Sequence, residues 1–453
     1  MSTSVAPPLG VNLGSRLSFM MFLQFAVWGA WLPILYPFLL GHRGFTLEET
    51  GLCLSAGAVG AIFGPFIAGQ LADRTISTEK LLGISHLIGA VLVYMLGEAD
   101  TFGGFMVLSA LYGFVYAPTI ALTNSLAFHH MPDRDRDFGL VRLWGTVGWI
   151  VAGIVVGQYL LRFATPAEGT LEQIEAAQNA GRSFAFTLSA GLGVLMGIYC
   201  FFLPHTPPSK SEDQKLAWAE ALSEIKMQPL LTLFLIAVPV SMVHQFYFVF
   251  TSQFVTEIQN AAASDAANSF ANAVNEILGV GGGGLMTIGQ MSEIAVLACI
   301  PVMAGRLSKK ALLCIGLAAY ALRMALFAFT PDLVPVMLGV ALHGVCFGCF
   351  IFVAFLVVDE HTSKDVRATA QNLFNLVIVG IGIIVGSWFA TAVVGKWANN
   401  IPVMENGVQV IDADGIAVNT MNWVDLFSVP MWIAVACLAV MLVAYPSRPV
   451  LKH

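Results

Sequence analysis

The sequence predicts an all-α membrane protein with twelve transmembrane helices, arranged as two six-helix pseudo-symmetric bundles. The first observation is composition: of 453 residues, 57% are apolar and only 11% are charged, whereas a soluble domain carries about 25% charged residues. Such a chain has too few polar groups to cover a surface in water, a requirement that a bilayer removes. The second observation is a series of long apolar segments, and the third is a set of first-half motifs that return in the second half.

Each apolar segment approaches the roughly 20 residues that a helix needs to cross the hydrocarbon core. In the first half, the predicted spans are 16–39, 48–72, 81–98, 104–128, 139–161 and 182–203. In the second half, they are 228–256, 284–304, 310–329, 333–358, 367–395 and 424–445. The first stretch is longer than the core of a cleavable signal peptide, about 7–15 residues, so we interpret it as the first span.

A charged stretch separates the two halves. It is the longest in the chain and includes the run PPSKSED over 207–213. We therefore expect an N-terminal bundle over 1–203, a linker over 204–227 and a C-terminal bundle over 228–453. The net charge of −7 is small for this length and the sequence has no basic stripe, so we expect no nucleic-acid partner.

The positive charges predict the orientation. An even number of spans places both termini on the same side as the linker. Fifteen of the 21 lysines and arginines fall on that side, four fall on the other side, and two lie within spans. By the positive-inside rule, the termini and the linker are cytoplasmic.

Two motifs of the first half return in the second half. Residues 65–69 (PFIAG) correspond to 301–305 (PVMAG), and each copy ends a helix before a short charged turn. Residues 111–113 (LYG) correspond to 342–344 (LHG), and each of these helices leads to a charged loop. Two similar bundles around a central axis are typical of alternating-access carriers.

Two segments outside the spans are polar. Residues 257–283 are rich in Ala and Asn and merge into a glycine-rich run over 279–284, whereas 397–422 form a polar outer loop. The glycine run lacks the Lys-Ser/Thr of a phosphate-binding loop, so we expect a hinge. Cys346 and Cys349 have the spacing of a metal or redox pair, but no second pair or histidine cluster accompanies them. We interpret them as packing residues, and we expect no metal and no cofactor.

Ionisable groups inside a span are costly and usually face the bundle interior or a water-filled cavity. Arg142 lies near the start of span 139–161, and Thr146 and Trp149 follow at i+4 and i+7 on the same helix face. A guanidinium, a hydroxyl and a large aromatic ring suit a polar ligand with a flat ring. The alternative is an arginine that extends to the membrane interface, with Trp149 as a packing residue.

Glu293 lies in the middle of span 284–304 and is the only carboxylate deep within any predicted span. Gln290 and Thr287 precede it at i−3 and i−6 and extend a polar stripe. A carboxyl group removed from water tends to keep its proton, which suits a proton carrier, and its ionised form accepts hydrogen bonds, which suits a ligand with hydroxyl groups. The alternative is a structural pair with Arg142 or with another helix.

Short motifs are spread from the first span to the eleventh. Residues 69–74 read GQLADR, and other segments read FLQF (22–25), YAPT (116–119), RLWGTVG (142–148), LPHTP (203–207), QMSE (290–293), LRMALFA (322–328) and VRATAQ (366–371). The first resembles the GxxxDR signature of the major facilitator superfamily, although the basic residues that usually follow are absent. The others are similar to the bacterial nucleoside–proton symporters, so the resemblance covers most of the chain.

This resemblance implies a monomeric carrier of the bacterial cytoplasmic (inner) membrane that takes up nucleosides together with protons through alternating access. In that family, the residues matching Arg142, Thr146 and Trp149 line the central cavity. Gln245 matches a substrate-contacting glutamine, and Phe248 stands where the family has a polar Asn. The substrate-binding residues expected on these grounds are Arg142, Thr146, Trp149, Gln245, Phe248, Gln290 and Glu293. Gly69, Asp73 and Arg74 are expected to brace the cytoplasmic gate.

Span 333–358 departs from the family pattern. The family has a carboxylate implicated in coupling after a Gly-x-x-Phe stretch, but here Gly344 to Phe347 is followed by Gly348. Glu293 is then the leading candidate for proton coupling, and His343 is a weak candidate substitute for the missing acid. The departure leaves open an uncoupled facilitator, or a proton-coupled carrier of another polar solute such as a sugar.

A membrane enzyme is a different class of function. It would need a nucleophile–base pair or a metal cluster near a membrane surface. The one such cluster, His129 and His130 with Asp133 and Asp135, lies in a charged loop without a nucleophile motif. We therefore expect a transporter and not an enzyme.

Overall fold

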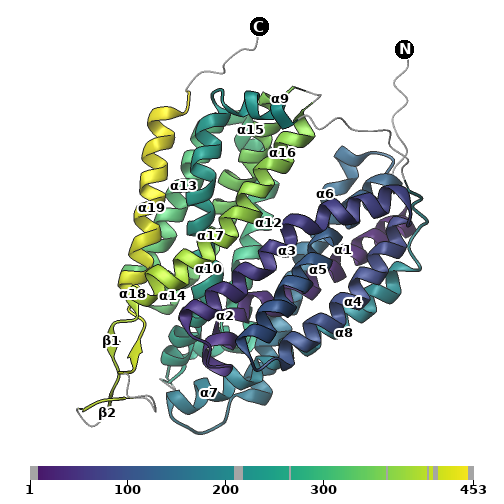
Figure 1. Cartoon of the computed structure of the whole chain (residues 1–453). Helices are drawn as coiled ribbons and strands as arrows, with labels where there is room; N and C mark the ends of the chain where they lie inside the picture. The colour runs from purple at the N-terminus through teal and green to yellow at the C-terminus, as the bar shows by residue number, and fades with distance from the viewer. Residues whose placement is uncertain are drawn as a thin grey trace, which may run out of the picture.

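Figure 1 shows two bundles of long helices, one from the first half of the chain (purple to blue) and one from the second half (teal to yellow). The computed structural model describes residues 9–208, 218–264, 267–363, 366–405, 408–411 and 417–446. Helices of the first half are α1 (Val11–Trp31), α2 (Leu35–Pro37), α3 (Leu47–Arg74), α4 (Thr78–Glu98), α5 (Phe102–His130), α6 (Arg134–Tyr159), α7 (Leu171–Gly181) and α8 (Ser183–Cys200).

The second half continues the helical pattern. Its α-helices are α9 (Trp218–Ile225), α10 (Leu230–Ala263), α11 (Ser269–Leu278), α12 (Gly283–Arg306), α13 (Lys309–Phe329), α14 (Leu333–Cys346), α15 (Val353–His361), α16 (Arg367–Asn375), α17 (Gly382–Trp388), α18 (Lys396–Ala398) and α19 (Trp423–Ala444). A 3-10 segment, η1 (Leu32–Ile34), and five π-helical segments lie within the long helices. The π-helical segments are η2 (Phe38–His42), η3 (Leu160–Ala164), η4 (Phe347–Phe352), η5 (Leu376–Ile381) and η6 (Phe389–Gly395).

Within the described residues, eleven helical segments are long and apolar enough to cross a membrane. They coincide with eleven of the predicted spans. The 28-residue helix α3, for which the side chains at 61, 65–70 and 73–74 are outside the described part, takes the place of the remaining span, 48–72. The prediction of an all-α membrane protein is therefore confirmed, with eleven candidate spans and α3 in the place of the twelfth.

The helices extend beyond the predicted spans where polar residues form their first or last turns. α3 begins at a capping box made by Thr46 and Glu49, and α6 begins at Asp133, whose side chain accepts a hydrogen bond from the Arg136 amide. α10 has 34 residues, or about 50 Å at 1.5 Å per residue, which exceeds the roughly 30 Å hydrocarbon core. The predicted end at residue 256 is wrong because α10 continues through polar residues to Ala263.

One repeated motif, LYG at 111–113 and LHG at 342–344, performs the same packing role in each half. A Cβ atom at Gly113 of α5 would lie 2.0 Å from the carbonyl oxygen of Gly57 in α3. A Cβ atom at Gly344 of α14 would lie 2.4 Å from the carbonyl carbon of Ser292 in α12. Each glycine thus allows two helix backbones to approach closely, as small residues do in membrane bundles.

The two ends of the molecule differ. We call the end that carries α9 the linker end, and the end that carries α7 and the strands the hairpin end (Figure 1). Hydrogen bonds join the two halves toward the hairpin end. They include Gln158 Nε2 to Glu276 O (2.8 Å), Val280 N to Gly157 O (3.1 Å), Gln253 Nε2 to Glu175 Oε1 (2.6 Å), Gln178 Nε2 to Asn260 Oδ1 (3.3 Å) and Lys396 Nζ to Glu48 Oε1 (2.7 Å).

The glycine-rich run forms a turn packed at this junction. Gly279, Gly281 and Gly282 have φ angles of 79°, 82° and 80°, a region that favours glycine. A Cβ atom at Gly279 would also lie 2.0 Å from the carbonyl carbon of Gly157 in the other half. The glycines predicted to form a hinge therefore also provide close packing between the halves.

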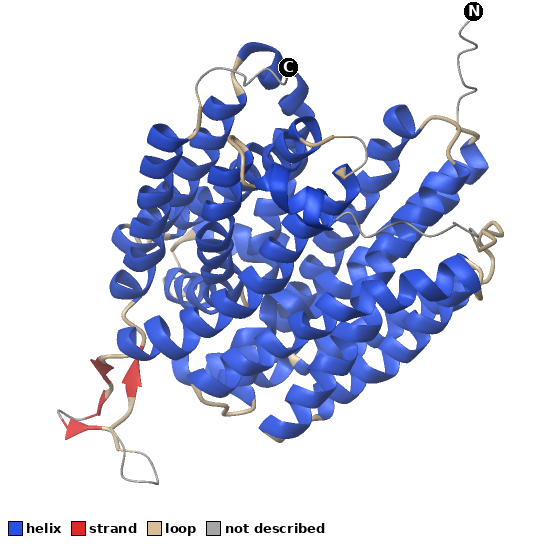
Figure 2. Cartoon of the chain, turned by 45° about the horizontal axis from the view of Figure 1, so that its top comes forward, coloured by secondary structure: helices blue, strands red, loops and turns tan. Residues whose placement is uncertain are grey.

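The polar loop 397–422, expected to lie outside, contains strands that the sequence does not predict. β1 (Ile401–Pro402) pairs with β4 (Asn419–Thr420), and β2 (Met404–Glu405) pairs with β3 (Val408–Gln409), both antiparallel. Figure 2 shows this hairpin in red, away from the helices. The backbone amide of Asn422 bonds to the carbonyl of Ala398 (2.8 Å) and closes its base.

Candidate substrate and proton site

The polar stripes predicted on α6 and α12 lie at the interface between the halves. Gly157 contacts Leu278 and Val280, which lie just before α12 in the chain, and Gly153 contacts Gly283 and Thr287 of α12, where a Cβ atom on Gly153 would lie 2.8 Å from Thr287 Cγ2. α6 and α12 therefore run antiparallel. Thr146 is seven residues from Gly153 and Glu293 is six residues from Thr287, so both lie roughly 10 Å along their helices from this contact.

Arg142 lies on the first-half side of this interface. Its guanidinium stacks on Phe25 of α1, with 3.9 Å between Cζ and the ring centroid, within the range of a cation–π interaction. The side chain is half-buried, and its charge interacts with that of Glu293 from the other half. This position favours a role in the bundle interior over an arginine that extends to the membrane interface.

Thr146 and Trp149 continue the same helix face, and both are half-buried. Trp149 also packs within the first bundle: a Cβ atom at Gly29 of α1 would lie 2.8 Å from its Cγ, and its ring centroid lies 5.8 Å from that of Trp28. Trp149 is therefore a packing residue on one side, while the stripe to which it belongs faces α12.

The α12 stripe contains a buried acceptor without a partner. Thr287 donates to the carbonyl of Gly284 (2.5 Å), so its hydroxyl is used within the helix. Gln290 is 7% exposed, and its Oε1 has no hydrogen-bond partner in the described part of the chain. Leaving such a group unpaired costs about 1–3 kcal/mol, and a bound ligand with a donor would remove that cost. Glu293 follows one turn later, with 15% of its side chain exposed.

Gln245 and Phe248 face the interior from α10. Gln245 is 8% exposed; its Oε1 accepts a hydrogen bond from Ser387 Oγ (3.3 Å), and its side chain packs against Gly386 of α17. Phe248 is half-buried, with its ring centroid 5.0 Å from that of His244 and 5.9 Å from that of His343. Phe248 therefore lies against the histidines next to Glu293.

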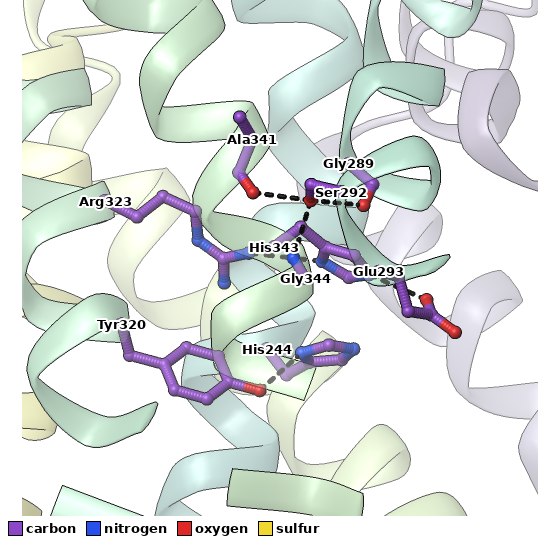
Figure 3. Close-up of polar contacts among 9 residues, drawn as sticks. All are labelled: His244, Gly289, Ser292, Glu293, Tyr320, Arg323, Ala341, His343 and Gly344. Carbon is purple, nitrogen blue, oxygen red and sulfur yellow. Dashed lines mark hydrogen bonds and ion pairs between the residues drawn. The ribbon is translucent and has the colours of Figure 1, made fainter. Parts of the chain in front are cut away.

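A buried polar cluster lies behind Glu293 (Figure 3). Arg323 of α13 is fully buried, and its NH1 lies 3.3 Å from His343 Nδ1 on α14. His343 Nε2 lies 3.9 Å from Glu293 Oε2. His244 Nδ1 lies 2.8 Å from the Tyr320 hydroxyl. One sequence feature points to this cluster, since Arg323 is one of two basic residues inside predicted spans. Its link to Glu293 through His343 was missed.

Two further charged residues, the half-buried Glu257 and the buried Arg182, were missed because they lie at predicted span ends. Glu257 falls just after the predicted end of span 228–256 but lies within α10, where it accepts hydrogen bonds from Trp423 Nε1 (2.7 Å) and Gln253 Nε2 (3.2 Å). Arg182 was counted among loop cations, but its side chain is fully buried. It donates to Asn179 Oδ1, to Thr256 Oγ1 (3.1 Å) and to the carbonyl of Gly281 (3.4 Å).

The predicted gate residues lie near the end of α3. Gly69, Asp73 and Arg74 belong to α3, but their side chains lie outside the described residues. At the linker end of the other half, Arg367 NH1 lies 3.6 Å from Asp359 Oδ2, and Lys309 pairs with Glu360. Over the described parts of the chain, no group of three or more His, Cys, Asp or Glu residues could hold a metal, and Cys346 and Cys349 are buried and unpaired.

The packing around Gly348 shows what surrounds the position of the missing acid. A Cβ atom at Gly348 would lie 2.7 Å from Val296 Cγ1 on α12. Val296 follows Glu293 by three residues, or about one helical turn. An acid at position 348 would therefore point toward the turn next to Glu293, whereas here α14 and η4 pack closely against α12.

Known proteins resemble this chain in sequence and in fold. The chain is 33% identical to the putative nucleoside transporter YegT of Escherichia coli over 383 residues, which cover 82% of each chain. It is 27% identical to the xanthosine permease of Escherichia coli over 390 residues, 83% of this chain and 87% of that one. The crystal structure of the nucleoside transporter NupG has the same fold, with a TM-score of 0.74, 24% identity, and coverage of 95% of this chain and 98% of the other.

The match at family level is nearly complete. Residues 11–448 match the family described as nucleoside H+ symporter, from the first turn of α1 to just beyond α19. With its membrane-spanning helices in a major facilitator fold and its polar residues gathered between two bundles, the chain belongs to the nucleoside H+ symporter family of membrane transporters.

Proposed function

We propose that this chain takes up nucleosides by proton symport through alternating access. The observation that carries the proposal is that Arg142 and Glu293, one from each half, lie within range of electrostatic interaction, next to the unpaired acceptor of Gln290. Carriers with a site between two repeats expose it to either side by rocking one bundle against the other. A site whose residues come from both halves is rearranged by that motion, so substrate binding and conformational change are coupled.

Each predicted residue has a chemical role in binding a nucleoside. The amides of Gln245 and Gln290 can donate to and accept from a base edge, and the rings of Trp149 and Phe248 offer faces on which a base stacks. Arg142 and Thr146 supply donors, and ionised Glu293 accepts from ribose hydroxyls. Glu293 is also the proton carrier, because it is the carboxylate that belongs to both the site and the interface.

The same proposal covers the cellular setting. The transporter lies in the bacterial inner membrane as a monomer, with the linker end and both termini in the cytoplasm. The fifteen-to-four distribution of lysine and arginine supports this orientation. The first bundle extends over 1–203 and the second over 228–453, joined by the linker 204–227.

Gly348 favours a second candidate, an uncoupled facilitator or a carrier of another polar solute such as a sugar, because the family acid is missing there. Uptake of labelled nucleosides and sugars into proteoliposomes, with and without a pH gradient, separates these functions. We expect accumulation of nucleosides above equilibrium only with an inward proton gradient. Equal uptake with and without the gradient indicates a facilitator, and preferential uptake of sugars excludes the nucleoside proposal.

A further inference from the structure

The surroundings of Arg323 are unusual for a buried cation. The side chain is fully buried, and within the described residues it forms no ion pair; its Nε and NH2 have no hydrogen-bond partner. Its guanidinium lies over the ring of Tyr247, 4.3 Å from the centroid, and 5.0 Å from that of Tyr320. NH1 has one polar neighbour, His343 Nδ1 at 3.3 Å.

This contact determines where neutral His343 carries its proton. An arginine guanidinium only donates hydrogen bonds and keeps its charge in proteins. His343 Nδ1 must therefore accept, and the proton of a neutral imidazole is then on Nε2. A doubly protonated imidazole would place a second donor opposite NH1, and the contact would be lost.

The other ring nitrogen points to the site. His343 Nε2 lies 3.9 Å from Glu293 Oε2, with 3% and 15% of the two side chains exposed. That separation exceeds a hydrogen bond by less than 1 Å, so a small rotation of Glu293 closes it. The Nε2–H group of His343, whose tautomer Arg323 determines, therefore faces the Glu293 carboxylate, which is the proton carrier in the proposed function.

The His343 ring is held from several helices. From α10, Tyr247 stacks on it with 4.9 Å between centroids, and His244 lies 5.4 Å away while bonding to Tyr320 of α13. The charged and titratable groups around the Glu293–His343 pair are Arg142 from α6, His244 and Tyr247 from α10, Arg323 and Tyr320 from α13 and Cys346 from α14. Arg142 is the cation from the first half that interacts electrostatically with Glu293.

We propose that His343, fixed by Arg323 as the Nε2–H tautomer, is the positioning residue that donates to Glu293 and so favours release of the transported proton. It does not itself carry that proton. This role rests on the proposed function. The Arg323–His343 pair acts in the region where the family acid is missing, since Gly348 contacts the helical turn after Glu293. Without the donor, Glu293 keeps its proton to higher pH.

Two measurements on the full-length protein test this. The first is 15N NMR of histidine-labelled transporter, with the His343 signal identified by its loss in His343→Gln. We expect the signature of an Nε2–H tautomer at pH 7, and a mixture of tautomers in Arg323→Met. An Nδ1–H or doubly protonated His343 in the wild type would overturn the proposal. This readout needs no substrate, so it does not depend on whether the transport proposal holds.

The second measurement is the pH profile of nucleoside binding to purified protein. We expect His343→Phe to move the midpoint upward by roughly one pH unit, the equivalent of one hydrogen bond to a charged group. His343→Gln keeps a donor near the Nε2 position and should restore the wild-type profile. His361→Phe is the matched control, because His361 Nδ1 bonds to a carbonyl of its own helix at the linker end (3.0 Å).

The outcomes separate the two proposals. An unchanged profile in His343→Phe, or a shift of equal size in His343→Gln, would show that His343 does not act as a donor to Glu293. If His343→Phe does not fold, the tautomer signals of the wild type and of Arg323→Met still decide, with His343→Gln identifying the His343 signal. Absence of gradient-driven uptake by the wild type, with the expected NMR and binding results, would refute proton symport and leave the positioning role intact.

Discussion

Arg182 in the first half donates a hydrogen bond to Thr256 Oγ1 in the second half (3.1 Å), and both side chains are fully buried. The same guanidinium reaches the carbonyl of Gly281, in the turn with left-handed glycines. This buried charge, with neutral acceptors from the opposite half, adds a charge-assisted contact to the hydrogen bonds that join the halves at the hairpin end.

Replacing Arg182 should therefore weaken the closed hairpin end. Hydrogen bonds to charged groups contribute about 1.5–3 kcal/mol, so Arg182→Met should shift the balance toward separated ends by roughly 10- to 150-fold. Spin labels at the exposed positions Glu168 and Ala273 report the distance between the halves. Arg162→Met is the control, since Arg162 is exposed and bonds to Gln158 in its own half; the same distance distribution in Arg182→Met as in the control would contradict the prediction.

Removal of a predicted site side chain should weaken nucleoside binding without unfolding the protein. Arg142→Ala, Gln245→Ala and Gln290→Ala should each cost about 0.5–3 kcal/mol, measured by calorimetric titration of purified protein. Gln371→Ala is the control, because its amide bonds to Asp359 at the linker end (2.8 Å). Wild-type affinity in all three variants would place the site elsewhere.

Glu293→Gln should abolish the coupling of transport to the proton gradient but leave the movement of substrate intact. The amide mimics a protonated carboxyl group and keeps most of its hydrogen-bonding capacity. We expect loss of uphill uptake driven by a pH gradient but retention of exchange down a nucleoside gradient, both measured in proteoliposomes. Gradient-driven accumulation at the wild-type level in this variant would show that the proton binds elsewhere.

The close packing of η4 against α12 should require a glycine at position 348. A side chain there would collide with Val296, so Gly348→Ala should destabilise the protein by about 1–3 kcal/mol, as overpacking does. Val296→Ala makes room, and the double variant should recover part of the loss in the thermal unfolding midpoint. Additive effects of the two substitutions would mean that these positions do not contact each other.

The orientation can be tested at two exposed positions, Met227 beside the linker and Val408 in the hairpin. In a background with Cys299 replaced, since Cys299 is exposed among the native cysteines, a cysteine at 227 should react only from the cytoplasm. A cysteine at 408 should react with an impermeant reagent added to intact cells. The reverse pattern would invert the proposed topology.

The spans and much of the candidate site could be predicted from the sequence because their signals are local. Arg142, Gln290 and Glu293 stand out as polar residues within apolar runs, and helical periodicity places them on defined faces. Arg182 gave no such signal, because a cation at a span end is expected to contact water. Its burial follows from the closure of two halves on each other.

The pairing of Arg323 with His343 could not be predicted either. The two residues lie on successive helices, and their contact depends on how α13 and α14 are rotated against each other. The π-helical segments depend in the same way on tertiary packing, and the strand pairs at 401–420 depend on contacts within a polar loop. Local propensity does not determine such features.

The hairpin between α18 and α19 has a practical consequence. Its base is closed by the Asn422–Ala398 hydrogen bond and by the pairing of β1 with β4, so the two helix ends that it joins are held close together. Exposed connections of this kind tolerate inserted domains. A small soluble domain with adjacent termini, grafted in place of residues 403–418, would add a rigid external marker for electron-microscopic image alignment without altering the helical bundles.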